Sequence, residues 1–323
     1  MAERRLMLLD TASLYFRAFY GVPTSVTNDA GQPVNAVRGL LDFIARFVTD
    51  YRPTHLACCW DNDWRPQWRV DLLPSYKTHR VAQTVPADQV VGAGGRGALS
   101  QVAEESPDEL TPQVPVIRDV LAALGIAVVG KDGYEADDVI GTLASTAGVP
   151  VDVVTGDRDL FQLVDDRTGV RVLYVARGIS RHERVDEAWV RERYAIPAAA
   201  YADFAVMRGD TSDGIPGVPG IGEKTAAQLL ARHTSLHGIL RAASDGDPTV
   251  TAGVRSKLAA AIDYLAVAPE VVAVARDLDL GVSLEDLALP TAPVQPERWS
   301  ELVAAWSLGG SAERIAAALA ARG

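Results

Sequence analysis

The sequence predicts an α/β fold in which a mainly parallel central sheet is flanked by helices. In the first half of the 323 residues, short apolar runs alternate with segments whose apolar residues recur at helical spacing. This alternation is typical of parallel strands joined by crossover helices. From about residue 184 the spacing is helical throughout, so a helical region is expected to follow the sheet.

Each expected strand is a short, mostly apolar run, as buried strands usually are. The strands are expected over residues 6–9, 54–60, 126–129, 151–154 and 170–175. Helical spacing predicts the helices between them, which include residues 37–48, 116–124 and 139–143. The adjacent Cys58 and Cys59 fall inside the second strand, where they are expected to be small core side chains rather than a disulfide or zinc site.

This pattern divides the chain into three parts. An α/β domain is expected over residues 1–183, a helical region over 184–290, and a tail with a short Ala-rich helix over 291–323. Residues 81–107 contain many glycines and few large apolar residues, which predicts a mobile loop. The apolar runs are too short for a signal peptide or a membrane span, so a cytoplasmic protein without a membrane partner is expected.

The formal net charge of −11 is unusual for a protein that binds nucleic acid, because Lys and Arg neutralise phosphates. The acids are clustered, however, and bound cations would cancel their charge. The basic residues are clustered too, and the local potential matters more than the total charge. Nucleic acid therefore stays among the expected partners.

Three aspartates lie where separate expected strands end. Asp10 ends the first strand, Asp61 follows the second, and Asp157 comes after the strand at 151–154. Ligand sites in open α/β sheets lie at the carboxyl ends of the strands, so these side chains are expected at one edge. A single Asp there is usually a helix cap or a turn residue, but three in the same position favour a shared site.

Further acids open other segments. Glu135, Asp137 and Asp138 begin the helix at 139–143, where acids also favour the positive end of the helix dipole. The remaining acids of interest are Asp159, Asp210 and Asp213. Carboxylates without an organised His or Cys set are typical of Mg²⁺ or Mn²⁺ sites rather than zinc sites. Two such ions can activate water and stabilise the leaving oxygen in phosphodiester hydrolysis.

A basic and aromatic segment follows Asp61, with four cations against one acid between residues 64 and 80. Cations interleaved with aromatic rings suit the phosphates and bases of a nucleic-acid strand, although any one of them alone fits a solvated helix. Arg17 is expected to face the same edge of the sheet. The other residues expected to contact the strand are Arg65, Arg69, Tyr76, Lys77 and Arg80.

A run of glycines over residues 214–222 precedes the start of another helix. These glycines suit a tight turn between two helices, where bare backbone N–H groups and a lysine would hold a phosphate without reading the base sequence. A plain helix–helix connector is the alternative interpretation. The residues expected to bind DNA here are Gly217, Val218, Gly220, Gly222, Lys224 and Thr225.

Together these motifs resemble those of the 5′ nuclease family of bacteria and phages, which includes the N-terminal domain of bacterial DNA polymerase I. They occur in the family's order over roughly residues 5–280. The matching segments are 9–19, 60–61, 76–80, 135–138, 155–159, 208–213 and the hairpin up to residue 225.

The resemblance implies a flap endonuclease and 5′–3′ exonuclease with a PIN-like fold. It implies a helical arch with a mobile loop over about 64–110 and a helix-hairpin-helix motif that holds duplex DNA with a K⁺ ion. At the base of the arch, Arg17, Lys77 and Arg80 would contact the reacting strand. The implied ligands of two or more Mg²⁺ or Mn²⁺ ions are Asp10, Asp61, Glu135, Asp137, Asp138, Asp157, Asp159, Asp210 and Asp213.

The implied substrate is branched DNA with a 5′ flap, RNA-primer flaps included, cut in replication and repair to leave a 5′-phosphate and a 3′-hydroxyl. Because the chain ends at Gly323 without a polymerase, a nucleoid-associated monomer that works beside a separate polymerase and ligase is expected. Residues 81–107 are longer and richer in glycine than the family's stretch, so the resemblance does not fix how a 5′ end passes the arch.

Three other functions share parts of this pattern. A metal-dependent ribonuclease of related fold would have little use for the hairpin, which suits B-form duplex. An aspartyl phosphatase would need a second Asp two residues after Asp10, where Ala12 stands. A DNA-junction binder without catalysis would not need every acidic position filled.

Overall fold

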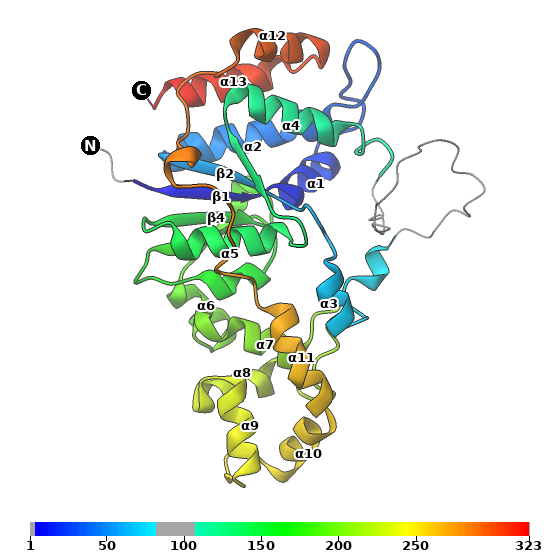
Figure 1. Cartoon of the computed structure of the whole chain (residues 1–323), viewed down its shortest axis with the longest axis vertical. Helices are drawn as coiled ribbons and strands as arrows, with labels where there is room; N and C mark the ends of the chain where they lie inside the picture. The colour runs from blue at the N-terminus through cyan, green and yellow to red at the C-terminus, as the bar shows by residue number, and fades with distance from the viewer. Residues whose placement is uncertain (1–3, 82–106, 323) are drawn as a thin grey trace, which may run out of the picture.

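One sheet of six strands is the centre of the computed structural model, which describes residues 4–81 and 107–322 (Figure 1). Strands β1 to β5 run parallel in the order β3-β2-β1-β4-β5, and β6 is antiparallel to β5 at one edge. The predicted fold class is confirmed. The strands are β1 (Leu6–Asp10), β2 (His55–Trp60), β3 (Ala127–Gly130), β4 (Val151–Thr155), β5 (Val170–Tyr174) and β6 (Glu183–Val185).

The central strand β1 is buried on both faces, as its unbroken apolar sequence requires. Leu6 and Leu8 face one hydrophobic core, whereas Met7 and Leu9 face the other, because successive side chains of a strand alternate. In register, Asp10 of β1 lies opposite Cys59 of β2. Asp10 and Asp61, which directly follows β2, therefore lie at the same edge of the sheet.

Helices cover both faces of the sheet, as Figure 1 shows. One face is covered by α1 (Thr11–Gly21), α2 (Asn35–Tyr51), α4 (Gln113–Leu124), α12 (Pro296–Ala305) and α13 (Gly309–Ala320). The other face carries α5 (Ala136–Thr146), α6 (Glu187–Tyr194) and α7 (Tyr201–Arg208). Among the described residues, no helix is both long and apolar enough to cross a membrane.

The residues expected to form a C-terminal tail instead complete the core. Helix α13 packs on α2, and its Ile315 and Leu319 are fully buried there. The sequence signal was weak because alanines make up much of this helix, and small side chains blur its apolar face. A second difference is β6, which straddles the expected boundary at residues 183 and 184 and contains the charged residues Glu183 and Arg184.

The helical region lies below the sheet in Figure 1. It consists of α8 (Glu223–His233), α9 (Leu236–Ser244), α10 (Ala252–Ala260) and α11 (Ile262–Val272). Helix α11 packs on α7 and on the short helix α3 (Gln67–Leu72), which begins the expected arch. Most of the expected loop at 81–107 lies outside the described residues.

Candidate active site

The strand order places a ligand site between β1 and β4. From β1 the chain moves outward through β2 and β3, and it then returns to β4 on the other side of β1. In open α/β sheets, the carboxyl ends of strands at such a reversal form a crevice that binds ligands. Asp10 ends β1, and Asp157 follows β4 at this position.

Five of the predicted acids line one cavity of about 250 Å³ at this edge. They come from the ends of three strands and from the first turn of α5. Two of the predicted cations, Lys77 and Arg80, line the same cavity. The acids are Asp10, Asp61, Glu135, Asp137 and Asp157.

Backbone and hydroxyl donors fix these carboxylates in place. Asp10 caps α1 by accepting from the Ser13 amide at 3.2 Å, and its second oxygen accepts from the Thr155 hydroxyl at 2.7 Å. Asp61 accepts from the Ala136 amide at 2.8 Å. The capping role and the cavity-lining role therefore coexist in Asp10, because a carboxylate has lone pairs for both.

The acids raise one another's pKa. Burial, followed by the charges of Asp61 and Asp157, raises the pKa of Asp10 to about 7. Burial and the neighbouring carboxylates also raise the pKa values of Asp137 and Asp157. Such a cluster is short of positive charge, and divalent cations supply it.

The donor set fits hard cations, although it is not gathered as a formed metal site. Over residues 4–81 and 107–322, no three His, Cys, Asp or Glu side chains are arranged closely enough to hold one ion. The carboxylates repel one another and are held by separate hydrogen bonds. A further sign of fit is Asp159 Oδ1, which is buried and lacks a hydrogen-bond partner among the described residues.

The base of the expected arch supplies the cations. Lys77 is 7% exposed, and its ammonium donates to the Glu135 carboxylate inside the cavity. Burial lowers the pKa of Lys77, but the combined effect of Glu135, Tyr76, Asp213 and Asp137 outweighs burial and leaves that pKa well above its usual value. Arg80 pairs with Asp213 at 2.7 Å, and the Lys77 amide donates to the Asp213 carbonyl at 2.9 Å. The arch base is thus fastened to the acidic loop at 210–214.

Of the four remaining acids, Asp159, Asp210 and Asp213 divide between two places. Asp159 and Asp213 line a small space that adjoins the cavity and also touches Glu135 and Asp137. Asp210 is paired with Arg158 at 3.3 Å and with Arg208 at 3.2 Å.

The predicted role of Asp138 needs correction. Asp138 is fully buried and does not line the cavity; both its oxygens accept from the Arg69 guanidinium at 2.8 Å. It also forms a capping box with Glu135 at the start of α5. Asp138 and Glu135 share a helix face, as their spacing predicted, but that face turns toward Arg69.

The strand contacts predicted for Arg69 and Tyr76 are also at odds with the structure. Arg69 is 2% exposed and Tyr76 is 4% exposed, so neither offers a surface to a strand. The Tyr76 hydroxyl donates to Glu135 at 2.8 Å, which makes Tyr76 a support for that carboxylate. Arg65 is half-buried and donates to the Tyr76 carbonyl at 2.6 Å, which braces the turn before Lys77.

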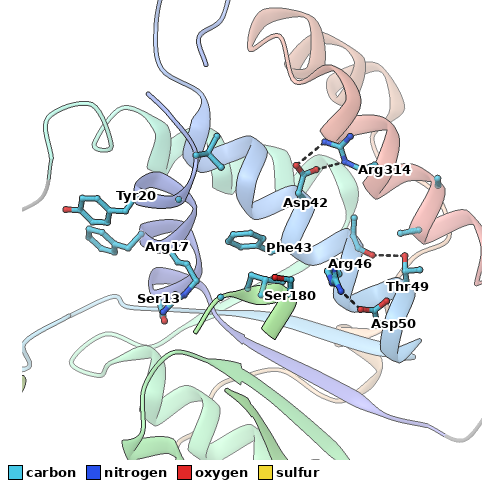
Figure 2. Close-up of a pocket in the computed structure, with 18 of the residues that line it drawn as sticks. Ser13, Arg17, Tyr20, Asp42, Phe43, Arg46, Thr49, Asp50, Ser180 and Arg314 are labelled. Carbon is cyan, nitrogen blue, oxygen red and sulfur yellow. Dashed lines mark hydrogen bonds and ion pairs between the residues drawn. The ribbon is translucent and has the colours of Figure 1, made fainter. Parts of the chain in front are cut away.

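Arg17 lies beside the cavity, in a larger neighbouring one. This second cavity, of about 1470 Å³, opens between α1, α2, α13 and the loop at 178–180, and Figure 2 shows Arg17 and Phe43 at its wall. Ser13 and Phe16 line both cavities. The predicted acids gather in the smaller cavity, whereas the acids of the larger one, Asp42 and Asp50, are paired with arginines.

The glycine hairpin joins α7 to α8. Gly217 has φ +71°, and a Cβ there would lie 2.7 Å from the Arg208 carbonyl oxygen, so only glycine allows this close approach. Gly217 and Val218 are buried, which restricts any contact from Val218 to its backbone. Gly220, Gly222 and Lys224 are exposed and Thr225 is half-buried, at the start of α8, where free amides can hold a phosphate.

Two supporting hydroxyls were missing from the predicted site. Thr155 donates to Asp10, and its hydroxyl accepts from the Asp157 amide at 2.9 Å, so it joins two strand-end acids. Ser13 accepts from the Gly156 amide at 3.1 Å. A signal was present, since both hydroxyl residues stand within three positions of a strand-end Asp, but their partners are distant in the sequence.

Comparison with known proteins shows the family of the chain. Residues 5–195 match a model of the N-terminal, resolvase-like domain of 5′–3′ exonucleases, and residues 196–295 match that of their C-terminal SAM fold. A 5′–3′ exonuclease of Streptomyces coelicolor is 57% identical over 315 residues, which cover 98% of this chain and all of the relative. One from Mycobacterium tuberculosis is 51% identical over 320 residues, 97% of each chain.

Solved structures share the fold. The flap endonuclease of bacteriophage T5, in a complex with DNA and metal ions, aligns with a TM-score of 0.59 and 17% identity. The alignment covers 99% of both chains.

Proposed function

From the membership of this chain in the 5′–3′ exonuclease family, we propose that it hydrolyses DNA phosphodiesters at 5′ ends and 5′ flaps. The products would be a 5′-phosphate and a 3′-hydroxyl. The observation that carries this proposal is the cavity in which five carboxylates from three strand ends and one helix meet Lys77 and Arg80.

We propose Mg²⁺ or Mn²⁺ as the ions. The oxygen-only donor set, the raised pKa values and the unpartnered Asp159 oxygen fit hard divalent cations. When bound, such ions would supply the Lewis acidity that phosphodiester hydrolysis needs. Asp10, Asp61, Glu135, Asp137 and Asp157 would hold them, with Asp159 and Asp213 at the adjoining position. Asp138 drops out of the proposed set, because Arg69 takes both its oxygens.

The cations of the cavity would act on the substrate. The Lys77 ammonium is charged and points among the acids, so it can approach the scissile phosphate and stabilise the negative charge that develops on it. Arg80 is half-buried at the rim of the cavity and can orient the same phosphate. Arg17 would contact the strand where it enters the neighbouring cavity.

Duplex DNA would lie on the hairpin and the first turn of α8, where Gly220, Gly222 and Lys224 are exposed. Contacts to phosphates alone fix position and not base sequence, so cutting should depend on the structure of the DNA. The Gly220 carbonyl accepts from the Lys257 ammonium at 2.8 Å. We therefore propose that K⁺, the ion expected at this hairpin, would compete with Lys257 for that carbonyl.

The test uses an end-labelled 5′-flap duplex with Mg²⁺, Mn²⁺ or chelator, and a matching flap made of RNA. Metal-dependent cutting near the junction is expected, and Asp157→Ala should lose it. Asp286→Asn is the control and should cut like the wild type, because the exposed Asp286 carboxylate accepts only from Ser283 among the described residues. Binding without cutting under either metal would refute the catalytic proposal. Cutting of the RNA flap alone would favour a ribonuclease.

The wider setting is also a proposal. A monomer would remove flaps, RNA primers included, beside a separate polymerase and ligase; the Streptomyces coelicolor relative, matched over its whole length, is likewise named a 5′–3′ exonuclease. Coupled cleavage and ligation of a nicked flap substrate in a reconstituted mixture would test it.

A further inference from the structure

After the last helix of the helical region, the chain returns toward the proposed metal site through a partly buried segment. Residues 271–276, here called the return segment, leave α11 and cross the start of α5. Val271 and Val272 line the small space that adjoins the cavity and that Asp159 and Asp213 also line. The return segment thus runs directly behind the proposed metal site.

Arg69 is at the centre of the contacts that hold this segment. Its Nε donates to the Val271 carbonyl at 3.0 Å, and its two Nη atoms bind Asp138 in a fork, each at 2.8 Å. One Nη also lies 3.3 Å from Glu135. A single buried guanidinium therefore contacts the arch base that carries it, the helix that carries the metal-site acids and the end of α11.

Asp138 adds further contacts between α5 and the return segment. Besides the Arg69 fork, it accepts from the Glu135 amide at 3.1 Å and from the Ala275 amide at 2.9 Å. Glycine at position 141 brings the two backbones together, because a Cβ there would lie 2.4 Å from the Ala275 carbonyl oxygen. The return segment is therefore packed against α5 without room for an intervening side chain.

Gln162 fastens the same segment from the side of Asp159. Its side chain donates to the Val272 carbonyl at 3.2 Å and accepts from the Val274 amide at 3.1 Å. It also donates to the Asp159 carbonyl at 2.9 Å. The two acid-bearing turns of the site, at 135–138 and 157–159, are thus joined to one segment of the helical region.

We propose that Arg69 is a positioning residue. It holds the metal-site carboxylates in a fixed position relative to the helical region that would bind the duplex. This inference rests on the proposed function of the site. The hairpin and α11 are both joined to α7. The Val218 amide donates to the Met207 carbonyl, and the Tyr264 hydroxyl of α11 donates to the Val206 carbonyl. The planar guanidinium binds both oxygens of Asp138 and the Val271 carbonyl through three separate nitrogens, a geometry that the single nitrogen of a lysine cannot reproduce.

The test compares Arg69→Lys with Arg171→Lys. Arg171 is a matched control, since it also pairs with a buried aspartate, Asp152 at 2.5 Å, but at the opposite end of the strands. Flap cleavage is measured against Mn²⁺ concentration, and Mn²⁺ binding is measured directly from the paramagnetic signal of the free ion. Thermal unfolding is recorded for both variants.

For Arg69→Lys, kcat or Mn²⁺ affinity should fall by about 10- to 100-fold, as is typical when a partner of a metal ligand is lost. The KM for the flap duplex should change little, and Arg171→Lys should lose stability without either effect. Gln162→Met keeps the Arg69–Asp138 pair and should give a smaller loss of kcat or Mn²⁺ affinity. This variant takes the place of Arg69→Lys in the test if Arg69→Lys does not fold.

Unchanged kcat and Mn²⁺ affinity in both site variants would overturn the inference, as would an equal loss in Arg171→Lys. A wild-type protein that cuts nothing would refute the proposed function instead. The Mn²⁺ titration would then still decide the role of Arg69.

Discussion

The Lys77 ammonium donates to the Glu135 carboxylate inside the cavity that the other acids of the site line. Lys77 has φ +47°, a left-handed conformation that is uncommon outside glycine, and the Asp213 carbonyl and the Arg65 side chain support the turn around it. A backbone held in this way places a positive charge among carboxylates before any substrate binds.

Replacing Lys77 should separate chemistry from binding. In Lys77→Met, kcat for flap cleavage should fall by about 10²- to 10³-fold, because a preorganised donor to the developing charge is lost. Duplex affinity should stay near that of the wild type, since the hairpin lies elsewhere. Single-turnover rates at saturating protein, beside a binding titration in chelator, measure the two effects. A fall in affinity with an unchanged single-turnover rate would contradict this role.

The acid cluster should make the metal-free protein less stable as the pH rises. The pKa of Asp10 is about 7 in the fold and near 3.8 when unfolded, so the folded state binds the extra proton between these values. Its protonation therefore favours the fold at low pH, and this advantage is lost as the pH rises from about 4 to 7. Each kcal/mol lost should lower the melting temperature by about 2–4 °C.

Melting curves of the metal-free protein at pH 5.5 and 8.0, with and without Mn²⁺, check this expectation. Added Mn²⁺ should remove most of the difference, because it replaces the protons between the carboxylates. Asp10→Asn should flatten the pH dependence. A metal-free protein that melts at a higher temperature at pH 8.0 than at pH 5.5 would show that other groups dominate.

Asp137 and Asp138 are neighbours with opposite expected phenotypes. Asp137→Asn should abolish cutting with little loss of stability, because Asp137 lines the cavity and its charge is destabilised by burial and by the nearby carboxylates. Asp138→Asn should lower the free energy of unfolding by up to about 3–5 kcal/mol, because it removes the charged fork to the buried Arg69 and leaves only Glu135, at 3.3 Å, to pair with it. Urea unfolding and flap cleavage of both variants decide the matter, and the reverse pattern would restore Asp138 to the ligand set.

Lys224 should contribute to DNA binding through charge alone. Lys224→Ala should weaken duplex affinity and lower the slope of log K against log salt by about 0.9, the value for one phosphate contact on duplex DNA. Lys131→Ala is the control, since Lys131 follows β3, outside the hairpin and α8, and donates to the Asp279 carbonyl. Titrations at several salt concentrations, with kcat at saturating substrate, measure both. An unchanged slope in Lys224→Ala would exclude a phosphate contact.

Much of the site could be predicted because local patterns carry it. Asp10, Asp61 and Asp157 lie at the ends of short apolar runs that are typical of buried strands, and parallel strands bring their carboxyl ends to one edge. Thr155 was missed because its partner Asp10 is 145 positions away, and nothing local marks that pair. The Ala-rich helix expected in the tail is α13, but its small side chains did not reveal that it is buried against α2, and α12 was not expected.

The sequence by itself determined that acids gather at the end of a parallel sheet, beside a basic segment and before a glycine hairpin. Only the tertiary structure decided which acid faces which partner. Neighbouring residues of an α-helix point about 100° apart, so the assignment of Asp137 to the cavity and Asp138 to Arg69 depends on the rotation of α5. The packing of Val139, Ile140 and Leu143 against the sheet sets that rotation, and these contacts join residues far apart in the chain.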